Sequence, residues 1–124
     1  MKSRNDPIYK QSPTVHRPWG TYTVLQESVG FKVKRIQVKP GNKLSLQSHK
    51  YRSEHWIVVS GKAFVTKDEE QVELLPNQSI YIPKGHRHRL ENRETEQLII
   101  VEVQCGDYLG EDDIVRYDDI YQRT

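Results

Sequence analysis

From Tyr22 onward the chain consists of short runs rich in Val, Ile, Tyr and Trp, each ended by turn-forming Pro, Gly or Asn. Pro40-Gly41-Asn42, Ser60-Gly61, Pro76-Asn77 and Lys84-Gly85 are typical of tight turns. No segment of useful length carries the apolar stripe of a helix. Short strands of this kind predict an all-β sandwich or barrel. The predicted strands cover residues 22–25, 32–38, 44–49, 54–60, 62–67, 71–75, 79–82, 88–91 and 98–104.

The charge balance and the N-terminal sequence argue against several classes of protein. Nineteen Lys and Arg residues against seventeen Asp and Glu give a formal net charge of +2, spread along the 124 residues, which is not a nucleic-acid footprint. No apolar stretch approaches the length of a membrane span, and the N-terminus lacks the apolar region of a signal peptide. Cys105 is the only cysteine, so an internal disulfide is excluded. We therefore expect a cytoplasmic protein with no nucleic-acid or membrane partner.

The chain divides into an arm, a barrel and a tail. Residues 1–15 are polar, contain Pro7 and Pro13, and are expected to form an N-terminal arm. Residues 16–110 would form the barrel, and residues 111–124 a tail that packs on its own or a partner's barrel. Residues 111–121 are acidic and aromatic, and fit either a short helix or an extended segment. An exposed strand edge and polar arms at both ends favour exchange between protomers, so we expect a homodimer.

Gln47, His49, Glu54 and His88 are candidate ligands of one divalent metal ion. Gln47 and His49 project to the same side of a strand, because strand side chains alternate with period two. Glu54 opens the next strand, which a short connection should bring back alongside, and the turn Pro83-Lys84-Gly85 should place His88 across the barrel. This mixed nitrogen and oxygen set suits Zn, Mn, Co or Ni, and also Fe, with positions left for substrate oxygens. The alternative is that all four are ordinary surface residues.

The spacing of these residues resembles the two signatures of the cupin superfamily. The matching residues are, in chain order, Gly41, Gln47, His49, Glu54, Gly61, Pro83, Gly85, His88 and Asn92. Gln47 stands where the first signature usually has His, and Asn77 stands where the second usually begins with Gly. The second departure is mild because Asn also tolerates positive φ. The resemblance implies an all-β cupin fold, a jelly-roll-like barrel also described as a double-stranded β-helix.

Flanking segments narrow the resemblance to one family. Residues 17–20, 31–36, 44–49, 52–61 and 108–116 resemble the type II phosphomannose isomerase domain. In that family it is the C-terminal part of bifunctional mannose-1-phosphate guanylyltransferase/mannose-6-phosphate isomerase enzymes, and Gln47 in place of His belongs to the family pattern. The likeness covers about residues 16–121 and does not include a nucleotidyltransferase domain. Met1 suggests a free-standing isomerase, for which a separate mannose-1-phosphate guanylyltransferase would be a partner. The alternative is a domain excised from a bifunctional enzyme.

The family resemblance implies a reaction and a substrate. It implies a metal-dependent interconversion of mannose 6-phosphate and fructose 6-phosphate, supplying mannose for GDP-mannose and polysaccharide synthesis. A proton moves between C1 and C2 of the open-chain sugar through an enediol(ate). The site must polarise the carbonyl, move the proton and hold the phosphate. The metal would perform the first task.

Four cations are candidate substrate-binding residues. Arg52 lies between two predicted ligands, and arginine grips phosphate bidentately; its alternative is an exposed turn residue. Lys34 shares a strand face with Ile36 and Val38, so it would bind substrate or assist proton transfer, or else reach solvent from the barrel mouth. Arg116 would close over the site from the tail of its own or a partner chain. Lys84, on the loop before His88, is a further candidate.

The general base is predicted to be Glu102. Glu102 shares a strand face with apolar neighbours, which would bring it to the cavity with a raised pKa. His86 and Lys84 are the alternatives, on the loop before His88. His16 and His55 are expected to be structural or surface residues, and Trp56 to be core or cavity wall. Arg52 and Lys34 complete the predicted catalytic set.

Other functions remain compatible with the same residues. One alternative is another metal-dependent sugar-phosphate or nucleotide-sugar isomerase or epimerase. A metal-dependent dioxygenase is less favoured because it leaves the phosphate-handling cations unexplained. From a different class, the domain would be a non-catalytic sugar-phosphate sensor or assembly module. Metal-dependent aldose–ketose turnover separates the enzyme from the sensor.

Overall fold

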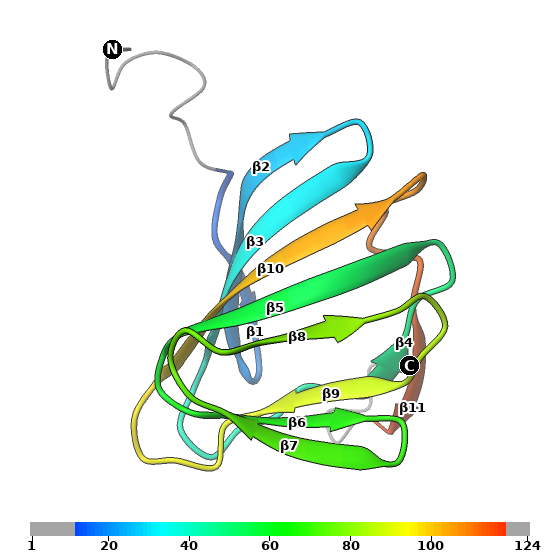
Figure 1. Cartoon of the computed structure of the whole chain (residues 1–124). Helices are drawn as coiled ribbons and strands as arrows, with labels where there is room; N and C mark the ends of the chain where they lie inside the picture. The colour runs from blue at the N-terminus through cyan, green and yellow to red at the C-terminus, as the bar shows by residue number, and fades with distance from the viewer. Residues whose placement is uncertain (1–11, 119–124) are drawn as a thin grey trace.

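The computed structural model describes residues 12–118, which form strands in two antiparallel sheets and contain no helix (Figure 1). The six-stranded sheet has the order β1-β2-β3-β10-β5-β8, and the five-stranded sheet has the order β11-β4-β9-β6-β7. Within residues 12–118, nothing helical has the length and hydropathy needed to cross a bilayer. The strands are β1 Val15–Arg17, β2 Gly20–Ser28, β3 Phe31–Val38, β4 Leu46–Ser48, β5 Arg52–Ser60, β6 Ala63–Lys67, β7 Glu70–Leu74, β8 Ser79–Ile82, β9 His88–Glu91, β10 Leu98–Gly106 and β11 Val115–Asp118.

The core lies between the two sheets because alternate residues of each strand point inward. Val38, Val58 and Ile100 from the first sheet and Val65 and Leu90 from the second are at most 1% exposed. All five belong to one cluster of buried apolar side chains. This arrangement confirms the predicted all-β cupin barrel.

At one end of the barrel, the inward-pointing residues of the strands are polar instead of apolar. On β3 the buried side chains change from polar to apolar between Lys34 and Ile36, and on β10 they change between Glu102 and Ile100, so both strands change at the same level. Lys34 and Glu102 are register partners in the β3–β10 ladder. The barrel therefore has an apolar end that stabilises the fold and a polar end that is available for chemistry.

Two of the signature residues have structural roles. Asn77 adopts a φ of 73°, as expected for an Asn at a position usually held by Gly. Asn92 is 1% exposed, and its side-chain nitrogen donates hydrogen bonds to the carbonyls of Val38 (3.0 Å) and Glu96 (2.7 Å). These bonds satisfy backbone groups that would otherwise be buried without partners.

The two edge strands β1 and β11 were not expected from the sequence, and β4 is shorter than the predicted strand over residues 44–49. β1 and β11 are short and lack a buried alternating pattern, so no local signal marks them. Residues 115–118 pair with β4, which places this part of the tail on the chain's own barrel in an extended form. The remainder of the expected arm and tail, residues 1–11 and 119–124, lies outside the described residues.

Candidate metal centre

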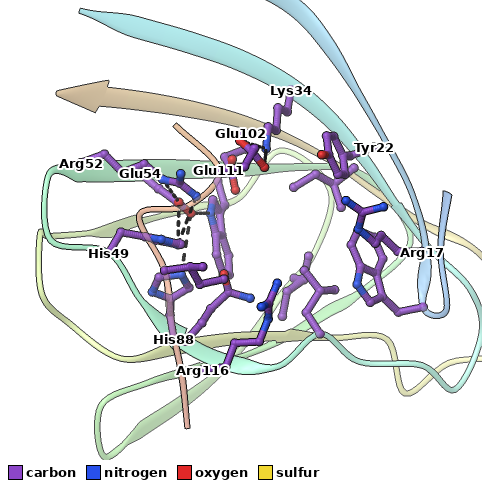
Figure 2. A pocket seen from close by; sticks show the side chains of 17 residues that line it. Arg17, Tyr22, Lys34, His49, Arg52, Glu54, His88, Glu102, Glu111 and Arg116 are labelled. Atoms are coloured by element: carbon purple, nitrogen blue, oxygen red, sulfur yellow. Dashed lines mark hydrogen bonds and ion pairs between the residues drawn. The ribbon is translucent and has the colours of Figure 1, made fainter. Parts of the chain in front are cut away.

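The polar end of the barrel contains a cavity lined by both sheets and by the segment before β11 (Figure 2). Its wall includes all four predicted metal ligands and the predicted substrate residues Arg52, Lys34, Glu102 and Arg116. The remaining lining residues are Arg17, Trp19, Tyr22, Ile36, Leu44, Trp56, Leu90, Glu111 and Ile114.

His49, Glu54 and His88 form a buried cluster on one side of this cavity. Nε2 of His49 lies 3.2 Å from Oε2 of Glu54, and Nε2 of His88 lies 3.9 Å from Oε1 of the same carboxylate. The potential ligand atoms all lie within 4.8 Å of one another, and each side chain is at most 3% exposed. Two imidazoles and a carboxylate at this separation are suited to a single transition-metal ion.

The strands assemble this cluster differently from the sequence-based expectation. β4 pairs with β9, where Gln47 is the register partner of His88, so these two residues lie side by side on one sheet. Glu54 comes from β5 in the other sheet, which pairs with β10 and β8 and not with β4. The expectation that Glu54 lies alongside Gln47 and that His88 lies across the barrel is therefore wrong. The short connection after His49 passes from one sheet to the other instead of forming a hairpin.

Backbone carbonyls select the histidine tautomer that a metal requires. Nδ1 of His49 lies 2.6 Å from the carbonyl oxygen of Asp113, and Nδ1 of His88 lies 3.1 Å from that of His86. Since a carbonyl only accepts, each Nδ1 carries the proton and each Nε2 presents a lone pair towards Glu54. Burial lowers the pKa of His49 to about 4 and also lowers that of His88, so both rings are neutral at neutral pH.

Gln47 completes the set through its amide oxygen. Its side-chain nitrogen donates to Oγ of Ser45 (3.1 Å) and to the Ser45 carbonyl (3.4 Å). With the nitrogen engaged, the oxygen is the atom that Gln47 would offer to a metal. The donor set therefore fits one divalent ion held by Gln47, His49, Glu54 and His88, with Zn, Mn, Co and Ni as the candidates.

Arg52 belongs to the metal end of the cavity. Its side chain is 6% exposed, so the alternative of an exposed turn residue is wrong. Nε donates to Oε2 of Glu54 (2.8 Å), and Nε1 of Trp56 donates to Oε1 of the same carboxylate (2.8 Å). Burial alone would raise the pKa of Glu54, but His88, His49 and Arg52 hold it at about 2. Glu54 is therefore an anionic candidate ligand with both oxygens oriented by neighbouring donors.

The pKa of Glu102 is shifted in the direction opposite to that of Glu54. Burial, followed by the adjacent charge of Glu54, raises the pKa of Glu102 to about 8. Its Oε1 accepts a hydrogen bond from Nε2 of Gln104 (2.5 Å). Glu102 lines the cavity, as expected from its strand face. The pKa values of two buried glutamates in one cavity are thus shifted in opposite directions.

Lys34 faces the cavity as expected, but it is already paired. Its Nζ donates to Oε1 (2.7 Å) and Oε2 (2.9 Å) of Glu111, which lies in the segment before β11. Lys32 donates to the carbonyl of Leu109 (2.7 Å) and approaches Glu111 as well. Burial opposes ionisation of Glu111, yet Lys34 lowers its pKa, so the pair is charged.

Two candidates from the sequence do not reach the cavity, and two charged residues on its wall were not predicted. Lys84 and His86 are exposed in the turn between β8 and β9, and His86 contacts Asp68 instead. Their proposed roles are therefore corrected, because the turn directs these side chains to solvent. Arg17 and Glu111 both line the cavity. Each lies in a segment that matches the family pattern, but residue type alone did not distinguish them from surface charges.

A family model described as "Mannose-6-phosphate isomerase C-terminal" matches residues 4–119. The chain belongs to this family. As a member of the mannose-6-phosphate isomerase C-terminal family, it is 58% identical over 110 residues to the xanthan biosynthesis protein XanB of Xanthomonas campestris pv. campestris. That match covers 89% of this chain and 24% of XanB. It is also 43% identical over 123 residues to the mannose-1-phosphate guanylyltransferase of Klebsiella pneumoniae, covering 99% of this chain and 26% of that protein.

The chain thus spans about a quarter of the length of these curated relatives. Among solved structures, a Klebsiella pneumoniae protein with a double-stranded β-helix domain superposes with a TM-score of 0.74 at 18% identity. That match covers 95% of this chain and all of the other one. The structural likeness supports the fold of this mannose-6-phosphate isomerase C-terminal family member, as expected for a cupin.

Asp113 is expected to position the metal ligand His49 in this family member. Its carbonyl orients the His49 ring, and its carboxylate accepts hydrogen bonds from the backbone nitrogens of Lys50 and Tyr51, both at 2.9 Å. Replacing Asp113 by Ala should weaken metal affinity by about 10- to 100-fold, as loss of groups behind a ligand usually does. Co²⁺ titration followed by tryptophan fluorescence would measure this, since Trp19 and Trp56 both line the cavity.

The matched control for this experiment is Asp112→Ala, because Asp112 is exposed and contacts the hydroxyl of Tyr108 instead of the ligand loop. The Asp113→Asn variant retains one acceptor oxygen, so its metal affinity should decrease less than that of Asp113→Ala. Equal metal affinity in the wild type and Asp113→Ala, with both proteins folded, would show that Asp113 has no positioning role.

Proposed function

We propose that this domain interconverts mannose 6-phosphate and fructose 6-phosphate as a metal-dependent isomerase. The observation that carries the proposal is one cavity holding a His–Glu–His cluster beside a second glutamate of raised pKa, Glu102. Membership of the mannose-6-phosphate isomerase C-terminal family supports the substrate. One relative is named for xanthan biosynthesis and another as a mannose-1-phosphate guanylyltransferase. Both names support a sugar phosphate as the substrate.

The metal site would serve the carbonyl chemistry. A divalent ion held by Gln47, His49, Glu54 and His88 supplies Lewis-acid polarisation when it is bound. Arg52 is oriented beside it through Glu54, and its Nη1 is buried with no hydrogen-bond partner among residues 12–118. We expect this N–H to donate to a substrate oxygen near C1 or C2, because a buried guanidinium nitrogen without an acceptor is costly.

Glu102 would move the proton. Conversion of the aldose to the ketose removes the proton on C2 and delivers one to C1, while the oxygens on the two carbons exchange their roles as hydroxyl and carbonyl. A carboxylate whose pKa is about 8 is a stronger base than an ordinary glutamate, and its protonated form is available at neutral pH for the return step. One side chain on the cavity wall therefore suffices to shuttle the proton between adjacent carbons.

The test is a turnover assay on the purified chain. Metal would be removed with a chelator, Zn, Mn, Co or Ni added in turn, and fructose 6-phosphate formation from mannose 6-phosphate followed. Turnover that appears only with added metal supports the proposal. A folded protein that binds metal and sugar phosphate but shows no turnover would be a sensor, and turnover of a different sugar phosphate would indicate another isomerase or epimerase.

We also propose that two copies of this chain pair through the outward face of the six-stranded sheet. That face carries Val33, Val101, Ile57 and Val59, the last two being 40% and 52% exposed. No carboxylate from β3, β5 or β10 lies on it within the described residues, and Arg35 on β3 is its charged side chain beside this apolar patch. Light scattering should give twice the 14.6 kDa chain mass, and Val59→Asp should give the monomer mass.

A further inference from the structure

We infer that Arg17 binds the phosphate of the substrate, at the end of the cavity opposite the metal centre. This inference rests on the proposed sugar-phosphate function and adds the orientation of the substrate to it. Arg17 lies on β1, at the edge of the six-stranded sheet, and lines the same cavity as the ligand cluster. Figure 2 shows Arg17 on the far side of the cavity from His49 and Glu54.

Two other cations of the cavity, Lys34 and Arg52, differ from Arg17 in being engaged by carboxylates. Lys34 is bound to Glu111 through both carboxylate oxygens, and Arg52 is bound to Glu54. Arg17 donates from Nη1 to the carbonyl of His16 (3.0 Å) and lies 5.6 Å from the centre of the Tyr22 ring. Within residues 12–118 it forms no ion pair with a carboxylate. Its guanidinium therefore retains donors for an incoming anion.

The local structure around Arg17 holds it at the cavity mouth. Arg17 pairs with Gly20 across the turn that joins β1 to β2. A Cβ on Gly20 would lie 2.0 Å from the carbonyl oxygen of Gln37, so the backbone approach at this turn requires glycine. Trp19 is 4% exposed, and its carbonyl accepts a hydrogen bond from the Lys39 nitrogen (2.9 Å). A buried tryptophan and a close backbone contact thus fix the turn that presents Arg17.

The chemistry of a hexose 6-phosphate matches this arrangement. Its reacting carbons, C1 and C2, and its phosphate, on C6, stand at opposite ends of the open chain. If C1 and C2 lie at the metal centre, the phosphate must lie at the other end of the cavity. A guanidinium matches the geometry of a phosphate dianion and binds it through two hydrogen bonds. Arg116, from β11 in the opposite sheet, also lines the cavity, but it is the register partner of the candidate ligand Gln47 and lies nearer the metal centre than Arg17 does (Figure 2).

The inference is tested with Arg17→Ala and Arg17→Lys. The KM for mannose 6-phosphate should rise by about 10- to 100-fold in Arg17→Ala, the range expected for lost hydrogen bonds to a charged group, while kcat changes by less than about threefold. The KM of Arg17→Lys should be intermediate between those of the wild type and Arg17→Ala, because lysine retains the charge and loses the bidentate geometry. Arg93→Ala is the matched control, since Arg93 is exposed and pairs with Glu91 outside the cavity.

A direct binding measurement separates this inference from the proposed reaction. Titration calorimetry of the metal-free protein would compare fructose 6-phosphate with fructose. The Arg17→Ala substitution should weaken the affinity for fructose 6-phosphate by about 10-fold or more and leave any affinity for fructose unchanged. If the wild type shows no turnover but this contrast is found, the isomerase proposal fails and the phosphate site stands. Equal affinity for fructose 6-phosphate in the wild type and Arg17→Ala, or no binding to either, would overturn the inference.

Discussion

Replacing His88 by alanine should abolish metal-dependent isomerase turnover, with a loss of about a thousandfold or more. The His88 Nε2 lone pair faces Glu54, and its Nδ1 proton is held by the His86 carbonyl, so no other side chain can take over this ligand position. A metal ion in such a site contributes several kcal/mol to stabilising transition-state charge, and each 1.36 kcal/mol is a factor of ten in rate. Turnover with excess metal and metal content after dialysis would both be measured.

The matched control is His55→Ala, which removes the same side chain from an exposed position. His55 stacks on Tyr81 on the outer face of the barrel, 4.6 Å between ring centres, and does not line the cavity. His55→Ala should keep its metal and its turnover, and thermal melting should show that both variants fold. A His88→Ala protein that retains stoichiometric metal and wild-type turnover would refute the ligand assignment.

Replacing Glu102 by glutamine should lower kcat by about 10²- to 10⁴-fold, the range for loss of a general acid–base group. The amide keeps the size of the side chain and its hydrogen bond with Gln104 can re-form, but it can neither accept nor release the reacting proton. Metal affinity should change little because Glu102 is outside the ligand cluster. Steady-state kinetics at saturating metal, paired with a Co²⁺ titration, would separate a catalytic loss from loss of the metal. A glutamine variant with wild-type kcat would exclude Glu102 as the base.

The same variant should change how the stability of the metal-free protein depends on pH. The pKa of Glu102 is raised to about 8 in the native state, whereas an unfolded glutamate titrates near about 4.3. Between these values the native state keeps a proton that the unfolded state releases. The contribution of Glu102 to stability is therefore complete below about pH 4.3 and is lost as the pH rises through 8, by at most about 1.4 kcal/mol per pH unit.

Urea unfolding at a series of pH values would measure this contribution as a difference between the two proteins. Glutamine does not titrate, so the free energy of unfolding of the wild type should fall relative to that of Glu102→Gln as the pH rises from 5 to 8. Parallel stability curves over this range would show that Glu102 has an ordinary pKa in the native state.

Much of the site was predictable because strand alternation is a local property. Once Ile36 and Val38 are inward, Lys34 must be inward too, and the same argument places Glu102 with Ile100. The spacing of Gln47, His49, Glu54 and His88 identified them as candidate ligands without knowledge of their neighbours. All of these residues line the cavity.

The errors concern relations between segments far apart in the chain. Lys84 is next to a ligand in sequence, yet its turn points it to solvent, whereas Arg17 is distant in sequence and lies on the cavity wall. Glu111 reaches Lys34 across 77 positions. Such contacts depend on which strands pair. The alternation of inward and outward side chains along a strand does not indicate which strand it pairs with.

The sequence by itself determined the all-β class, the inward face of each long strand and the set of candidate metal ligands. These follow from side-chain periodicity and from the chemistry of His, Glu and Gln, which act over a few residues. Only the tertiary structure decided that His88 lies beside Gln47 while Glu54 faces them from the other sheet. It also decided that the pKa of Glu54 is lowered and that of Glu102 raised, because a pKa depends on burial and on the charges that folding brings close.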